Sequence, residues 1–189
     1  MNIKTTVNIE EEKGIAEYNF DFSGEETARS VCEKVLELEH CPMNAEVSVL
    51  YVDDSSIQEI NSMARGVDAV TDVLSFPNLP FEEYEGNDKK ENRKDSPCWD
   101  TLLSQESKAD LLDPLTGDLV LGDIVLNLDA VKRQAKEYEH SCKREFAFLI
   151  AHSMLHLCGY DHETDEEEQN MIARQEKVLR ELRITRDSQ

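Results

Sequence analysis

Three of the five histidines of this 189-residue chain lie within one short segment, and imidazole is a common ligand for transition metals. His152 and His156 are four residues apart in an apolar run, so a helix places both rings on one face, one turn apart. Gly159 allows the left-handed turn that ends such a helix, and His162 follows where it can return toward the pair. Three neutral imidazoles arranged in this way favour Zn²⁺, with a fourth position left for water.

The same spacing occurs in the metzincin zinc proteases, whose helix reads H-E-x-x-H-x-x-G-x-x-H. Their general base is the glutamate after the first histidine, and Ser153 stands there in this chain. A metallopeptidase is therefore a disfavoured alternative. A second alternative is a non-catalytic module with a structural zinc, which needs a fourth protein ligand. The nearby candidate is Cys158, which lies about 200° around the helix from His156 and is expected in the core.

Two further side chains near these motifs are candidates for chemistry. Arg65 precedes Gly66 at the end of a short predicted helix, and its planar guanidinium suits a phosphate that approaches a metal. By spacing alone, a surface ion pair of Arg65 with Asp68 or Asp72 is the favoured interpretation. Asp161 is the carboxylate nearest to the histidines in sequence. It either orients a histidine or caps a turn, and the sequence leaves both interpretations open.

The elements that must position these residues follow from hydrophobic periodicity. The short helix is expected to be capped by Asp54 or Ser55, and the last helix by Thr164 with Glu167 in a capping box. Strands mixed with helices, followed by a helix-rich end, predict an α+β fold with one small mixed sheet. Strands are expected at 3–9, 45–52, 71–76 and 118–127, and helices at 25–40, from about 54, and at about 128–139, 142–158 and 165–183.

The chain length suits a single domain over residues 1–189. Between 78 and 117 the sequence becomes polar and loses its periodicity, which predicts a mobile insertion on that domain. Within the insertion, leucine spacing over 101–112 suggests a transient helix.

The composition excludes several classes of protein. With 20 Lys and Arg against 41 Asp and Glu, the net charge is −21, which argues against a nonspecific duplex-DNA binder and against binding to an anionic membrane surface. No apolar run reaches the roughly 20 residues of a membrane span, and the N-terminal residues do not resemble an export signal. The five cysteines form no CxxC pair and read as reduced thiols, so the cytoplasm is the expected compartment.

The histidine motif, the segment TDVLSFP at 71–77 and the segment LGDI at 121–124 together resemble the bacterial YbeY family of rRNA maturation endoribonucleases. The resemblance covers about residues 1–77 and 118–180. It implies a small α+β fold whose metal-binding helix is similar to that of the zinc metalloproteases. It also implies a zinc-dependent, single-strand-specific endoribonuclease that matures the 3′ end of small-subunit rRNA and takes part in late ribosome quality control.

The resemblance also implies roles for particular residues and partners. One Zn²⁺ per chain would be held by His152, His156 and His162, and Arg65 would be the functional arginine that faces the metal cleft. The implied partners are single-stranded rRNA, the small ribosomal subunit with its proteins, and a ribosome-associated GTPase. The chain departs from the family pattern where Ser153 replaces a glycine and Val70 a proline, and where 78–117 replaces a shorter connection.

The strongly negative charge conflicts with an RNA substrate, because RNA is itself a polyanion. A nuclease of this charge needs a local basic patch or a docking partner. A solvated helix face is the alternative interpretation of the basic residues. The candidates for the patch are Arg65, Lys132, Arg133, Lys136, Lys143 and Arg144.

Overall fold

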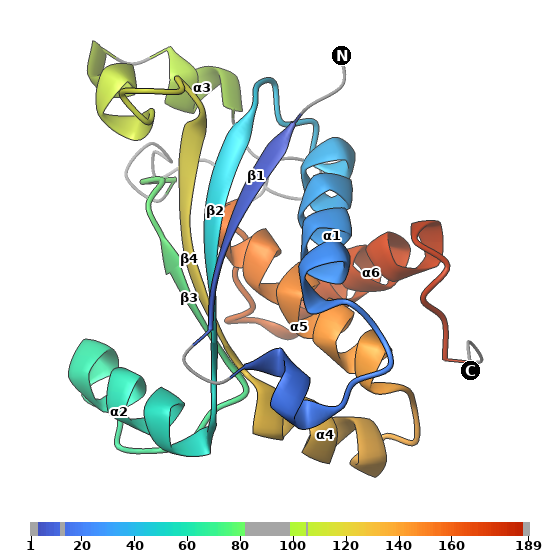
Figure 1. Cartoon of the computed structure of the whole chain (residues 1–189). Coiled ribbons are helices and arrows are strands. Elements are labelled where there is room, and N and C mark those ends of the chain that lie inside the picture. Colours follow the sequence, from blue (N-terminus) through green and yellow to red (C-terminus); the bar gives the residue numbers. More distant parts are fainter. Residues whose placement is uncertain (1–3, 12–13, 82–98, 105, 187–189) are drawn as a thin grey trace.

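The computed structural model describes residues 4–11, 14–81, 99–104 and 106–186. Within them, four strands form one mixed sheet in the order β1-β2-β4-β3 (Figure 1). β1 pairs in parallel with β2, and β2 with β4, whereas β3 runs antiparallel along the edge of β4. The strands are β1 (Thr5–Glu11), β2 (Ala45–Val52), β3 (Val73–Pro77) and β4 (Leu119–Asn127).

The helices divide unequally between the two sides of the sheet. Helices α1, α4, α5 and α6 lie on one side of the sheet, while α2 lies on the other side and contacts β3, β4 and α4 (Figure 1). The bounds are α1 (Gly24–Leu38), α2 (Asp54–Arg65), α3 (Trp99–Leu103), α4 (Leu128–Glu137), α5 (Cys142–Leu157) and α6 (Asp165–Glu181), with the 3₁₀-helices η1 (Ile15–Tyr18) and η2 (Glu106–Leu111).

Helix α5 is the central element of the fold. It is apolar around most of its circumference, as expected of a helix with neighbours on all sides. It packs against α1, α4 and α6 and against β3 and β4, and Phe146, Ile150 and Met154 are completely buried. The Ser141 hydroxyl caps its first turn by accepting the backbone N–H of Arg144. His152 and His156 therefore project from a helix that is held on several sides.

Gly122 allows β3 to lie close to β4. The pairing of β2 with β4 shifts its register beside this glycine, whose φ is +133°. A Cβ atom at Gly122 would lie 2.1 Å from the carbonyl oxygen of Phe76 in β3. Only glycine fits this approach, which places one end of β3 beside the histidines of α5.

Most elements lie where the sequence predicted them. The α+β class with one mixed sheet is confirmed, as is the capping box of Thr164 and Glu167 at the start of α6. The predicted cap of α2, Asp54 or Ser55, was wrong. Asp53 is the cap, and its carboxylate accepts the backbone N–H of Ser56. The four-residue helix η1 was missed because it is too short to produce a periodic pattern.

The segment expected as an insertion, 78–117, is described in part, since 82–98 and 105 lie outside the described residues. Helices α3 and η2 occur where a transient helix was expected. The side chains of Trp99, Leu102 and Leu111 are buried against the main core, and the indole N–H of Trp99 donates to the carbonyl oxygen of Glu39 at 2.7 Å. The single-domain assignment and the bounds of the insertion stay predictions. In the described part of the chain, no helix is long and apolar enough to cross a membrane.

Candidate metal centre

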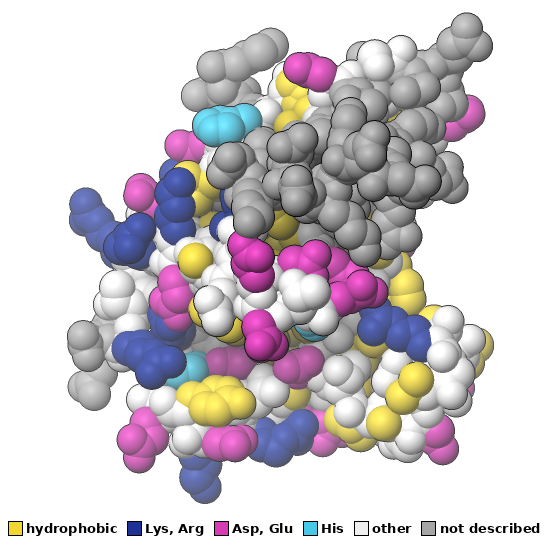
Figure 2. Space-filling view, turned by 180° about the vertical axis from the view of Figure 1, so that it is seen from behind, with side chains coloured by type: hydrophobic (Ala, Val, Ile, Leu, Met, Phe, Trp, Pro, Cys, Tyr) yellow, Lys and Arg dark blue, Asp and Glu magenta, His cyan; other side chains and the backbone are white. Residues whose placement is uncertain are grey.

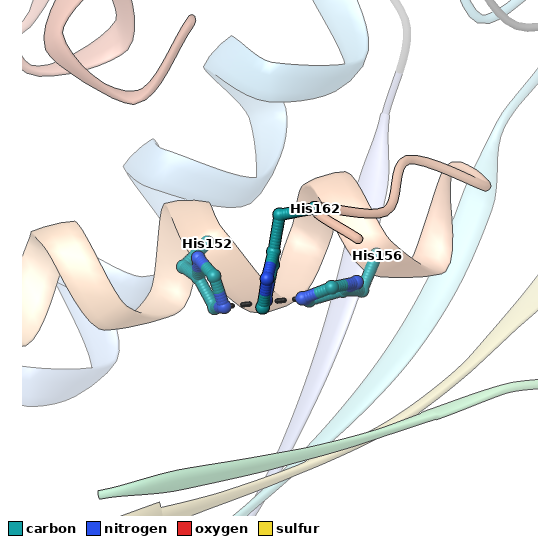
Figure 3. A group of neighbouring side chains, drawn as sticks. All are labelled: His152, His156 and His162. Carbon is teal, nitrogen blue, oxygen red and sulfur yellow. Dashed lines mark hydrogen bonds between the residues drawn. The ribbon is translucent and has the colours of Figure 1, made fainter. Parts of the chain in front are cut away.

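The structure brings the three predicted histidines together. One nitrogen atom from each of His152, His156 and His162 lies within 4.8 Å of the other two. The Nε2 atoms of His152 and His156 are 3.1 Å apart, and the His162 ring comes from the segment after α5 and points between them (Figure 3). This arrangement forms a three-nitrogen pocket of the kind that binds a divalent transition metal.

Two of the rings have a further polar group beside them. The Nδ1 atom of His156 lies 2.9 Å from the carbonyl oxygen of Tyr160, so this nitrogen carries the hydrogen and leaves the Nε2 lone pair free. The side chain of Gln175 on α6 lies close enough to His152 to raise its pKa, although burial dominates and lowers that pKa. In the metal-free protein the Nε2–H of His152 can donate to the bare Nε2 atom of His156, 3.1 Å away, and a metal ion replaces this hydrogen when both lone pairs bind it. The donor set therefore fits a metal ion.

The protonation states agree with this fit. Burial, together with the neighbouring His156 and His162, lowers the pKa of His152 to about 4. Burial and the proximity of His162 also lower the pKa of His156. Both imidazoles are therefore neutral at neutral pH, and the neutral ring is the form that binds metal.

The turn after α5 returns His162 to the other two histidines. Gly159 has a φ of +87°, which is the left-handed conformation predicted from the sequence. A Cβ atom at Gly159 would lie 2.7 Å from the ring of Phe81, so the aromatic ring packs directly on this turn. Glycine is required here by both conformation and space.

Arg65 shares a cleft with the histidines. The cleft has a volume of about 860 Å³, and its walls include β3 and the turn after α5. Arg65 ends α2, as predicted, and Gly66 follows in the left-handed conformation. Nη2 of Arg65 donates to the carbonyl oxygen of Ser75 at 3.2 Å, and its guanidinium carbon lies 5.9 Å from the centre of the Phe76 ring. Its positive charge is close enough to lower the pKa of His156, although burial is the main cause of that shift.

The ion pair of Arg65 with Asp68 or Asp72 does not form. The Asp68 carboxylate accepts a hydrogen bond from Gln58, and the Asp72 carboxylate accepts one from Gln134 and one from the backbone N–H of Val73. Asp72 also lines the cleft. The guanidinium of Arg65 is therefore available to an anion in the cleft.

Asp161 caps the turn after α5 and does not orient a histidine ring. Its carboxylate accepts the backbone N–H of His162 at 2.8 Å, which stabilises the turn. The orientation of His156 comes instead from the carbonyl oxygen of Tyr160.

The two alternative functions, a metallopeptidase and a non-catalytic module with a structural zinc, find no support at this site. Ser153 is completely buried and does not line the cleft, so it cannot replace the glutamate of a metallopeptidase. Cys158 is 2% exposed and does not join the histidine cluster, and burial raises the pKa of its thiol well above the usual range. Within the described residues, the cluster therefore lacks the fourth protein ligand of a closed structural zinc site.

The six candidates for a basic patch are not gathered at the cleft. Arg144 was wrongly included, because it is 3% exposed and bonds Glu176 and the carbonyl oxygen of Ile184. Arg133 pairs with Asp54. Of the six candidates, only Arg65 lines the cleft.

Sequence reasoning missed the residues that support the histidines. Gln175 lies on α6, and Glu39 immediately follows α1, far from the histidines in sequence. Glu39 is 2% exposed, which is unusual for a carboxylate and indicates a buried ion pair. A lone glutamate at a helix end carries no sequence signal for such a role.

Comparisons with known proteins agree with the fold and the site. A family model described as Endoribonuclease YbeY matches residues 7–183. The Endoribonuclease YbeY of Lachnoclostridium phytofermentans is 42% identical over 181 residues, which cover 96% of this chain and 99% of that protein. The one from Agathobacter rectalis is 45% identical over 170 residues, which cover 90% of this chain and 94% of that protein.

A solved structure supports the fold independently. The solution structure of TM1509 from Thermotoga maritima superposes with a TM-score of 0.52 at 22% identity, and the match covers 94% of this chain and 92% of that one. The family model and the relatives together span nearly the whole chain, including all three histidines. The chain therefore belongs to the YbeY family of metal-dependent endoribonucleases.

Proposed function

We propose that this chain is a zinc-dependent, single-strand-specific endoribonuclease of the cytoplasm that matures the 3′ end of small-subunit rRNA and acts in late ribosome quality control. The observation that carries the proposal is the cleft shared by Arg65 and the three histidines. A cationic donor next to a metal pocket matches the needs of phosphodiester cleavage.

The residues of the cleft have distinct roles in this proposal. His152, His156 and His162 would hold one Zn²⁺, which when bound supplies a Lewis acid beside the phosphodiester. Arg65 uses one N–H on the carbonyl oxygen of Ser75, and its other N–H groups can bind the scissile phosphate and stabilise its developing negative charge. A recessed cleft favours a single strand, because a flexible strand can turn its phosphate inward and a duplex cannot.

The partners follow from the charge of the surface. Figure 2 shows acidic and basic side chains interspersed over one face of the described part of the molecule. With a net charge of −21, the surface suits basic ribosomal proteins better than free RNA. We infer docking on the small ribosomal subunit through its proteins, with a ribosome-associated GTPase as a further candidate partner.

The test is cleavage of a labelled single-stranded RNA that contains the 3′ end of small-subunit rRNA, with zinc and with a chelator. We expect cleavage by the zinc-loaded wild type. It should be abolished in His156→Ala and reduced about 10²–10³-fold in Arg65→Ala, with the zinc content of Arg65→Ala unchanged. The failure of metal-loaded wild type to cleave free RNA or small subunits would contradict the proposal.

A further inference from the structure

Behind the histidines lies a buried polar cluster that joins three distant parts of the chain. Glu39, which follows α1, accepts a hydrogen bond from the hydroxyl of Tyr160 at 2.6 Å. Nη1 of Arg174 on α6 donates to both carboxylate oxygens of Glu39, at 2.8 and 3.0 Å. The guanidinium of Arg174 also lies 4.6 Å from the centre of the Tyr160 ring. Tyr160 is thus held by a hydrogen bond at its hydroxyl and by a cation on its ring.

Tyr160 connects this cluster to the metal pocket. Its carbonyl oxygen is the partner of Nδ1 of His156, so the position of the Tyr160 backbone sets the orientation of that imidazole. His162 follows two residues later, and its path back to the cleft begins from the same anchored position. One buried side chain therefore affects the placement of two of the three histidines.

The side chains of the cluster are largely shielded from water. The side chain of Glu39 is 3% exposed and that of Arg174 is 17% exposed, so water cannot replace the hydrogen bonds between them. The backbone carbonyl of Glu39 is also fixed, by the indole N–H of Trp99. Burial of a carboxylate costs free energy even when the carboxylate is paired, so this ion pair is weak evidence for stability and its fixed contacts point to a role in geometry.

We propose that Glu39 is a positioning residue for the metal site, acting through Tyr160 on His156 and His162. The inference rests on the proposed zinc site. Loss of the Glu39 carboxylate frees the Tyr160 side chain, and the Tyr160 backbone then no longer holds the His156 ring in one orientation. Metal affinity falls although all three imidazoles remain.

The test measures zinc binding to the metal-free protein by competition with a chromogenic chelator. In Glu39→Gln and in Tyr160→Phe we expect the Kd for zinc to rise about 10–100-fold. The double variant should be no weaker than the weaker single variant, because both changes break the same connection. The visible spectrum of the cobalt(II)-substituted protein should change in the same variants, since it reports ligand geometry.

A matched control separates positioning from loss of stability. Val31→Ala, in the buried face of α1, destabilises the fold but should leave the Kd for zinc unchanged. Tyr160→Phe removes one hydroxyl only, so it remains informative if Glu39→Gln does not fold.

The possible failures are distinguishable. A wild type that binds no zinc would overturn the zinc site and this inference with it. A wild type that binds zinc, together with Tyr160→Phe of the same Kd and cobalt spectrum, would overturn the positioning role alone. Additive losses in the double variant would show that Glu39 does not act through Tyr160.

Discussion

At the scale of single residues, the structure decides between the roles that the sequence left open for side chains around the metal pocket. The sequence predicted the three histidines together, because i,i+4 spacing and a following glycine translate directly into geometry. For Arg65, spacing alone favoured a surface ion pair and the family resemblance implied a role in the cleft, since the choice depends on which acids lie nearby. The structure shows that Asp68 and Asp72 bond other side chains, so the guanidinium faces the cleft.

Gly159 gives a first prediction at this scale. Gly159→Ala should lower the free energy of unfolding by about 1–2 kcal/mol for its left-handed backbone and by about 1–3 kcal/mol more for the contact with Phe81. The displaced turn should also weaken zinc binding. Urea unfolding of the metal-free protein and zinc titration measure the two effects.

Gly117 supplies the control for this prediction. Its φ is +72°, but a Cβ atom would meet nothing within 4 Å. Gly117→Ala should therefore show the backbone cost alone and bind zinc as the wild type does. Equal destabilisation of the two variants would contradict the role given to Phe81.

Glu145 gives a second prediction at this scale. Burial, and then the charge of Asp72, raises the pKa of its carboxyl group to about 7. Nδ1 of His140 faces the carbonyl oxygen of Ser141 and carries the hydrogen. The Nε2 atom of His140 can therefore accept a hydrogen bond from the protonated carboxyl group of Glu145, 3.0 Å away. The folded protein therefore keeps a proton on Glu145 that the unfolded chain loses above its ordinary pKa of 4.5.

The proton retained on Glu145 makes the stability of the fold fall as the pH rises. The stability that it contributes is full below about pH 4.5 and is lost as the pH rises through about 7, with a slope of at most about 1.4 kcal/mol per pH unit. Glu145→Gln should thus gain stability relative to the wild type as the pH is raised over this interval. Urea unfolding of both proteins at several pH values, with a chelator present, measures the difference. A constant difference would show that the carboxyl group has an ordinary pKa in the fold.

At the scale of elements, local signals predicted helices and strands well but not the contacts between them. The capping box of α6 was readable because Thr164 and Glu167 are three residues apart. The contacts that α6 makes with the rest of the fold could not be predicted from the sequence. Its residues Arg174 and Gln175 meet Glu39 and His152, and such pairings depend on how the helices pack. The support of the metal site is therefore tertiary information that periodicity does not contain.

The capping box of α6 yields a third prediction. Thr164→Ala removes the hydroxyl that accepts the backbone N–H of Glu167, which should lower the free energy of unfolding by about 1 kcal/mol. Thr164→Ser keeps the hydroxyl and should remain close to the wild type. Thermal unfolding followed by circular dichroism distinguishes the two variants, and an equal loss in both would exclude the hydroxyl as the cause.

At the scale of the whole molecule, the excess of acidic residues makes the chain repel RNA. The net charge follows directly from the composition, but composition does not show that Arg144 is buried in an ion pair or that Arg133 is paired with Asp54. The cleft therefore has Arg65 as its one arginine or lysine among the described residues. A single cation does not offset the repulsion between two polyanions.

This balance predicts an unusual dependence on salt. Raising KCl from about 20 to 150 mM should increase kcat/KM for free RNA or leave it unchanged, because salt screens the repulsion. A nuclease that neutralises several phosphates would instead lose affinity steeply. Initial rates at fixed zinc over this range make the measurement. A steep fall in rate would show that a basic surface outside the described cleft binds the RNA.

The ion pair of Glu39 with Arg174 spans 135 residues of sequence, and this separation orders events during synthesis. A ribosome that adds about 5–20 residues per second releases Glu39, then the histidines, and finally Arg174. Until α6 has left the exit tunnel, the nascent chain carries the imidazoles but lacks the counter-charge that fixes Tyr160. With Glu39 as a positioning residue for a zinc site, we expect firm metal binding to await α6, so a nascent chain arrested before Arg174 should retain zinc poorly.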